Sequence, residues 1–258
     1  MQIPDHSTGV NISSDTLFHF TSSLDHLLNI LENDFSPRYC PEYITADASG
    51  KNPIEALPMV CFCDLPIFLV NRHLSNYGNY GIGLTKEWGI RSELTPVLYV
   101  HGNSPTLTSL TPLLRIALKD VKQSMSDKDT GHISRILSYV RPIEGPAWRK
   151  GKQINNVRFY NEREWRFVPF IDNPTLTHKL SFQESQNNSR LVEANTEMAR
   201  HFKLSFTPSD IRYIIVNSDS EIIPMIAKLE AVKSRFSLAE VKILTTRIIT
   251  AQQIRLDF

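Results

Sequence analysis

Short strand-like segments recur along the chain, and helical patterns separate only some of them. Residues 17–21 form an aromatic-rich segment typical of a strand. Directly after it, leucines at positions 24, 27, 28 and 31 repeat at the spacing of one helix face, and that helix should end near Asp34. Strands and helices do not alternate regularly, as they would in a doubly wound sheet. The pattern therefore predicts an α+β fold with a mixed, mainly antiparallel β-sheet core and flanking helices.

The rest of the chain supports the same fold class. After a polar loop from Ser36 to about Leu57, further strands are predicted at 58–63, 96–100, 156–160, 164–168, 211–216 and 241–244, and the Gly-rich run 77–85 is expected to form a turn that leads into a short strand. Further helices are predicted from Pro66 to about Ser75, briefly from Lys86, over residues 107–125 and from about Ser220. The segments 156–160 and 164–168 are expected to pair across a short polar link, and the last third should form one strand–helix–strand unit.

The length and the composition favour a single globular domain. The chain has 258 residues, 41% of them hydrophobic and 21% charged, which excludes collagen-like, coiled-coil and wholly disordered chains. No repeat, low-complexity tract or Pro/Ser-rich linker divides it. We therefore predict one domain over residues 1–258, with residues 1–16 as a flexible N-terminal segment.

Cysteine usage and hydropathy bear on where the protein works. Two of its three cysteines, Cys61 and Cys63, lie in an apolar run, where free thiols pack as small hydrophobic groups. The longest apolar stretch, residues 57–70, contains Asp64 and two prolines and is too short to span a bilayer. The N-terminus lacks the order of a signal peptide. We expect a cytoplasmic protein without membrane contact.

The first candidate site is the pair His19 and Thr21. In a strand their side chains share one face, so an imidazole and a hydroxyl project together, a combination that can grip a ribose diol. The alternative is that His19 is a structural strand residue, with its hydrogen bonds satisfied and with the core residues Phe18 and Phe20 on either side of it.

The second candidate is the segment 162–166. Strand alternation would place Glu162, Glu164 and Arg166 on one face and Trp165 and Phe167 on the other, facing the core. Two carboxylates and a guanidinium on one face can stabilise developing positive charge. The alternative is a solvated face of an edge strand with cross-strand ion pairs.

The third candidate is a positive stretch around that segment. Residues 149–166 contain six basic and two acidic residues, a local charge of +4 in a chain whose total is +1. Such a stretch suits a phosphate-bearing ligand, a nucleic acid or a protein partner, and we assign this role to Arg149, Lys150, Lys152 and Arg158. The alternative is solvated surface.

Other motifs are excluded. The Gly-rich run 77–83 matches neither a P-loop nor a dinucleotide fingerprint, and no Gly-x-Ser-x-Gly is present. Cys61-x-Cys63 has no second cysteine pair, and no His-x-x-x-His spacing occurs, so we expect no metal site.

Taken together in order, five blocks of sequence resemble the AbiGi family of abortive-infection, phage-resistance proteins, which are described as antitoxins. The blocks lie at residues 17–21, 58–66, 73–88, 96–99 and 159–166, and the likeness extends over roughly residues 14 to 250. The resemblance implies a role in phage defence, with a cognate toxin or a phage component as the partner.

A more distant resemblance is to ADP-ribosyltransferases of the DNA-modifying DarT kind, which have an early strand with His-x-Thr and a catalytic Glu on a late strand. It implies an ADP-ribosyltransferase-like fold with NAD as co-substrate and a nucleic-acid acceptor. His19 and Thr21 would bind the adenosine ribose, Tyr77 or Tyr80 would stack on the nicotinamide, and Arg166 would hold the pyrophosphate. Glu164 would be the catalytic residue.

Two hypotheses therefore remain open for the function. One is an NAD-using transferase of phage defence. The other is a non-catalytic antitoxin that neutralises a toxin or senses a phage component by binding.

Overall fold

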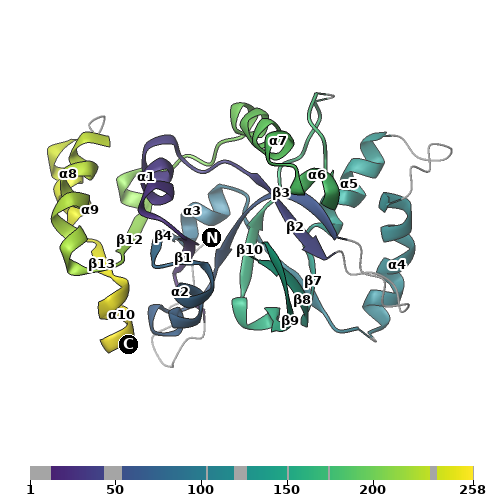
Figure 1. Ribbon diagram of the computed structural model, residues 1–258, viewed down its shortest axis with the longest axis horizontal. Helices are drawn as coiled ribbons and strands as arrows, with labels where there is room; N and C mark the ends of the chain where they lie inside the picture. Colours follow the sequence, from purple (N-terminus) through teal and green to yellow (C-terminus); the bar gives the residue numbers. More distant parts are fainter. Residues whose placement is uncertain are drawn as a thin grey trace. The chain divides into compact units, whose positions relative to one another are not determined.

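The fold is α+β with a mainly antiparallel sheet, as the sequence predicts. The computed structural model describes residues 13–43, 54–102, 104–118, 127–149, 151–173, 175–232 and 237–257. The chain folds into two compact units (Figure 1). Unit 1 comprises Met1–Asp34, Phe62–Arg91 and Phe206–Phe258, and unit 2 comprises Phe35–Cys61 and Ser92–Ser205. The prediction of a single domain stays a prediction.

The sheet of unit 1 is built around its first strand. Its strands are β1 (Thr16–Thr21), β4 (Tyr80–Thr85), β12 (Ile211–Val216) and β13 (Ile248–Thr250), in the order β13-β12-β4-β1. β1 pairs antiparallel with β4, and β4 pairs antiparallel with β12, whereas β12 and β13 are parallel. Phe18 of β1 also pairs with Cys63 at the end of β3 (Ile54–Cys63).

Helices flank this sheet. They are α1 (Leu24–Asn33), α2 (Asn71–Tyr77), α3 (Lys86–Arg91), α8 (Ile222–Val232), α9 (Leu238–Thr245) and α10 (Ala251–Asp257). The 3-10 segments are η1 (Ile67–Leu69), η3 (Pro208–Asp210) and η4 (Asp219–Glu221). Helix α1 is confirmed, and its N-cap is Ser23, whose hydroxyl accepts a hydrogen bond from the backbone N–H of His26. On its inner side Leu27 and Leu31 are fully buried.

The predicted strand at 241–244 is wrong, because these residues lie in α9. A capping box begins that helix: Ser237 accepts from the backbone of Glu240, and Glu240 accepts from the backbone of Ser237. The strand–helix–strand unit still exists, but its second strand is β13, which pairs parallel with β12. Two helices, α8 and α9, therefore make the crossover.

Asp64, at the end of the buried β3 run, holds the N-terminal approach to β1. Its carboxylate accepts hydrogen bonds from the Ser13 hydroxyl and the Ser14 backbone, and it forms a 2.9 Å ion pair with Lys86. Residues 13–16 of the N-terminal segment are thus held by defined contacts. Residues 1–12 lie outside the described part of the chain.

A glycine allows the tight approach of β4 to β1. Gly78 has φ +129°, and a Cβ there would lie 2.3 Å from the carbonyl oxygen of Thr21. We expect Gly78→Ala to lower the free energy of unfolding by about 2 kcal/mol, because the left-handed backbone strain adds to this clash. Chemical denaturation would measure the loss. Gly102→Ala is the matched control, since no heavy atom lies within 4 Å of its Cβ position. Equal losses of unfolding free energy in Gly78→Ala and Gly102→Ala would contradict the close contact described at Gly78.

Unit 2 is centred on the long strand β3. Beside it lie β2 (Arg38–Tyr43), β10 (Glu164–Phe167) and β11 (Leu180–Ser181), and β10 pairs in turn with β5 (Thr95–Pro96). Two small sheets complete the strands: β6 (Leu98–Val100) with β7 (Val140–Pro142), and β8 (Glu144–Arg149) with β9 (Lys152–Arg158). Its helical segments are α4 (Pro105–Leu118), α5 (Asp127–Leu137), η2 (Phe159–Glu162), α6 (Phe182–Gln186) and α7 (Asn188–His201).

Three local predictions in unit 2 are wrong. The polar loop from Ser36 contains β2, and β3 begins before residue 57. The segment 96–100 divides into two strands that belong to different sheets. The pair 156–160 and 164–168 does not form, since β9 pairs with β8 and β10 pairs with β5. Between them the chain forms the 3-10 turn η2, and Arg163 takes a left-handed conformation at φ +44°.

A buried charge network and the candidate functional site

The charged face of β10 is its buried face. Glu164 is 5% exposed and Arg166 is 0% exposed, whereas Trp165 and Phe167 on the other face are half-buried. The expectation that Trp165 and Phe167 form the core-facing side is therefore wrong, and so is the alternative that the charged face is solvated. Glu162 is buried too, but it lies in η2 and not in the strand. A two-residue period shows which side chains share a face and not which face is buried.

Both carboxylate oxygens of Glu164 are occupied. Arg166 Nε donates to Oε1 at 2.7 Å, and Arg141 Nη1 lies 2.5 Å from Oε2. The Cys61 thiol donates a further hydrogen bond to this carboxylate. The backbone N–H of Glu164 donates to the Tyr99 hydroxyl at 2.9 Å. Glu164 is thus held in place from several elements of unit 2.

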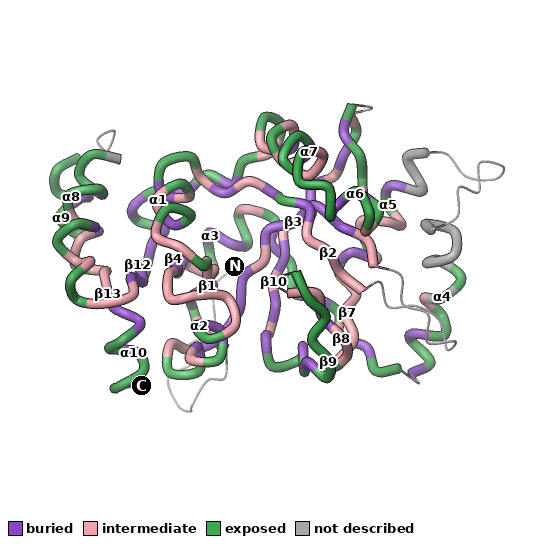
Figure 2. Tube along the Cα trace, viewed as in Figure 1, coloured by how far each residue is buried: buried purple, intermediate pink, exposed green. Residues whose placement is uncertain are grey.

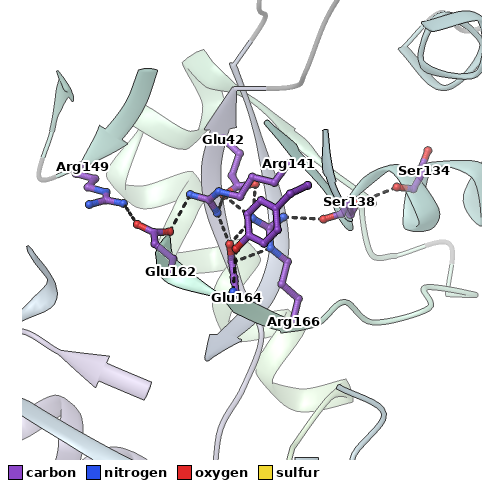
Figure 3. A network of polar contacts seen from close by, with 9 residues as sticks. Glu42, Ser134, Ser138, Arg141, Arg149, Glu162, Glu164 and Arg166 are labelled. Carbon is purple, nitrogen blue, oxygen red and sulfur yellow. Dashed lines mark hydrogen bonds and ion pairs between the residues drawn. The ribbon is translucent and has the colours of Figure 1, made fainter. Parts of the chain in front are cut away.

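The contacts continue on both sides of this pair (Figure 3). Arg166 also donates to the Ser138 carbonyl oxygen at 2.6 Å and lies 2.8 Å from Glu42, which pairs with Arg141 as well. On the other side, Arg141 lies 3.5 Å from Glu162, and Glu162 pairs in turn with Arg149. We call these six charged residues the buried network. Its members are Glu42, Arg141, Arg149, Glu162, Glu164 and Arg166.

The arginines of the buried network keep the carboxylate of Glu164 ionised although this side chain is buried. Burial raises the pKa of Glu164, but the positive charges of Arg141 and Arg166 outweigh it and lower the pKa to about 2. Burial lowers the pKa values of Arg141 and Arg166, but the carboxylates of Glu164 and Glu42 outweigh burial and raise both values. Three negative and three positive side chains therefore neutralise one another. This arrangement can cross-link strands, but it offers a ligand no unused oxygen of Glu164.

Burial has the opposite outcome for the nearby thiols, because it keeps them protonated. Burial raises the pKa of Cys40 to about 11 and the pKa of Cys61 well above its ordinary value. A thiol is nucleophilic only as its thiolate. All three cysteines are reduced in the structure.

In unit 1, three of the predicted cofactor-binding residues share one face of the sheet. His19 and Thr21 alternate along β1, and Thr21 pairs directly with Tyr80 of β4. All three are half-buried. The His19 ring lies 5.5 Å from that of Phe62, and the Tyr80 hydroxyl donates to Glu221 at 2.9 Å.

Tyr77 belongs to a different group of side chains. Its ring stacks on His73 at 5.8 Å, and His73 in turn lies 5.9 Å from Phe20. Phe20 lies on the face of β1 opposite to His19. The structure thus brings His19, Thr21 and Tyr80 together within unit 1, and Glu164 with Arg166 within unit 2.

The predicted basic residues have separate roles. Arg149 is drawn into the buried network, whereas Lys152 and Arg158 are exposed on β9. Lys150 lies outside the described residues. The local charge of +4 therefore includes Arg149 and Arg166, whose charge is neutralised inside unit 2.

Sequence reasoning missed Glu42 and Arg141, although both contact Glu164 or its partner Arg166. Glu42 is 122 positions before Glu164, in a strand that resembles a loop because it contains Pro41. Within the described residues, no three His, Cys, Asp or Glu side chains gather as metal ligands would. None of the helices found there is long and apolar enough to cross a bilayer.

Comparisons with known proteins identify the family. A family model described as "Putative abortive phage resistance protein AbiGi, antitoxin" matches residues 33–217. An "Abortive phage resistance protein AbiGi" from Lactococcus lactis subsp. cremoris is 30% identical over 248 residues, which cover 87% of this chain and 99% of that protein. No solved structure matches the chain. The matched region, residues 33–217, contains all six members of the buried network. The chain therefore belongs to the AbiGi family of abortive phage resistance proteins.

Proposed function

We propose that this protein acts in phage defence as a non-catalytic antitoxin, which neutralises a cognate toxin by binding it in the cytoplasm. The description of the family as an antitoxin supports a toxin as the partner. The state of Glu164 supports binding without catalysis. Both its oxygens are engaged by arginines, and its side chain is 6% exposed. A catalytic carboxylate must face its substrate.

Co-expression with the toxin tests this proposal. Cells that express the toxin should survive when the protein is present, and His19→Ala should rescue them as well as the unchanged protein does. The purified protein should release no nicotinamide from NAD. Loss of rescue by His19→Ala, together with nicotinamide release by the unchanged protein, would contradict a non-catalytic role.

A second candidate is an NAD-dependent ADP-ribosyltransferase with a nucleic acid as acceptor. The shared face of His19, Thr21 and Tyr80 favours it, because an imidazole and two hydroxyls can hydrogen-bond a ribose diol. These residues would hold the nucleoside part of NAD. Glu164 and Arg166 fit their proposed roles less well, since each is already bound by the other.

NAD binding distinguishes the two candidates. If the transferase is correct, isothermal titration should show NAD binding that His19→Ala weakens. Nicotinamide release should then require Glu164, with Glu164→Gln inactive although folded. If neither NAD binding nor nicotinamide release is detected in the presence of host or phage nucleic acid, this second candidate is eliminated.

A further inference from the structure

The β8–β9 hairpin carries a run without acidic residues. Residues 145–161 contain four Lys or Arg and no Asp or Glu, although acidic and basic residues are almost equal in number in the whole chain. The run also contains four amide side chains: Gln153, Asn155, Asn156 and Asn161. Cations and amides without carboxylates suit a polyanion.

Strand β9 presents this composition to solvent. Residues 151–156 and Arg158 are exposed, as Figure 2 shows along the strand. In the part of the chain that the structure describes, β8 and β9 form a two-stranded sheet, so the outer side of β9 is an edge. An edge strand offers backbone N–H groups, which are common donors to phosphate oxygens.

The two exposed cations of β9 flank that edge from both sides. In the register of the two strands, Lys152 lies opposite Arg149, and Arg158 lies opposite Glu144. Between the register pairs Gly145–Val157 and Ala147–Ile154, β9 has one residue more than β8. This bulge places Lys152 and Arg158 on opposite faces of the ribbon. They lie about 20 Å apart along the strand, at about 3.3 Å per residue. A chain of phosphates that follows the edge would pass between them.

An aromatic ring lies just after the strand. Tyr160 is 53% exposed, and the Tyr99 ring packs edge-on against it at 5.3 Å. An exposed ring whose orientation is fixed by a neighbour can stack on an unpaired base. A duplex would leave no base face available for it, so the ring favours a single strand.

We propose that the edge of β9, with Lys152, Arg158 and Tyr160, binds single-stranded nucleic acid. A strand of a protein partner fits this edge less well, because charged side chains along an edge oppose pairing with a further strand. The site is independent of the proposed toxin binding and requires neither NAD nor Glu164. Glu144, at the start of β8, is the acidic residue opposite Arg158 in the strand register.

Fluorescence anisotropy with labelled 12-mers of oligouridine and oligothymidine tests the site. Lys152→Ala/Arg158→Ala should weaken binding at least tenfold at 50 mM salt. It should also reduce the slope of log K against log salt by about 1.4, because each phosphate contact in a single strand contributes about 0.7. Tyr160→Ala should weaken binding about tenfold with an unchanged slope, since stacking involves no counterion.

A matched control is Lys228→Ala/Lys242→Ala, which removes two exposed cations from α8 and α9. It should change neither affinity nor slope. Preference for oligouridine or for oligothymidine would identify RNA or DNA as the ligand. Absence of binding by the unchanged protein would overturn the proposal, and so would equal losses in the two double variants. If the β9 variants bind toxin more weakly and no oligonucleotide binds, the edge is a protein interface instead.

Discussion

Replacing Arg166 by methionine is expected to lower the free energy of unfolding by about 3–5 kcal/mol. Methionine fills much of the same volume, but it leaves the buried Glu164 and the half-buried Glu42 with one cation fewer. Removing one partner of a buried pair is costly because the remaining charge loses its compensation. Urea denaturation followed by circular dichroism would measure the loss. If the variant is too unstable to purify, a soluble yield at low temperature below that of the unchanged protein shows that its stability has decreased.

Two further variants make this prediction specific. Arg200→Met removes a cation of similar size that is 69% exposed and paired with Glu197, and it should cost less than about 0.5 kcal/mol. Glu164→Gln/Arg166→Met removes one negative and one positive charge, so the four remaining members of the network are again neutral in total. This double variant should be more stable than Arg166→Met. If the losses of the two single variants simply add, the two side chains are not coupled.

The second large effect is on the acid stability of the protein. The pKa of Glu164 is about 2 in the folded protein, against about 4.3 for an unfolded chain. A lowered folded-state pKa stabilises the protein above the unfolded value, and this contribution is lost as the pH falls toward the folded value. Between about pH 5 and pH 2, the protein should therefore lose on the order of 3 kcal/mol through this carboxyl.

Glu164→Gln isolates that contribution, since the amide cannot titrate. Its free energy of unfolding should be lower than that of the unchanged protein at pH 7, and the difference should shrink as the pH falls toward 2. Other carboxyls titrate in both proteins and cancel in the comparison. A difference that stays constant with pH would show that Glu164 is not held ionised by its arginines.

Local patterns predicted the elements whose signals are contained in a few neighbouring residues. β1, α1 and β12 occur where an aromatic segment, helical spacing and an apolar run place them, and β4 lies within the run 77–85 that predicts a turn and a short strand. The error at 241–244 has a visible cause. A short apolar run fits a strand as well as a helix, and the capping box at Ser237 and Glu240 was the signal that decides between them.

The candidate site could be predicted only in part, because its partners come from distant strands. Spacing correctly places Glu164 and Arg166 on one face of one strand. It does not show that Glu42 and Arg141 approach them, since those contacts depend on how β2 and β7 lie in unit 2. Burial reversed the interpretation of the face. A charged strand face that resembles solvated surface is the interior of unit 2, and its charges compensate one another.

The measurement that tests the structural role of Glu164 most directly is toxin rescue by Glu164→Gln/Arg166→Met. This variant lacks the candidate catalytic carboxylate and keeps the network neutral, so it should fold, as circular dichroism and gel filtration would verify. If the network serves the fold and the protein neutralises its toxin by binding, the folded variant rescues cells as the unchanged protein does. A variant that is folded and binds the toxin, yet fails to rescue, would show that Glu164 or Arg166 takes part in chemistry.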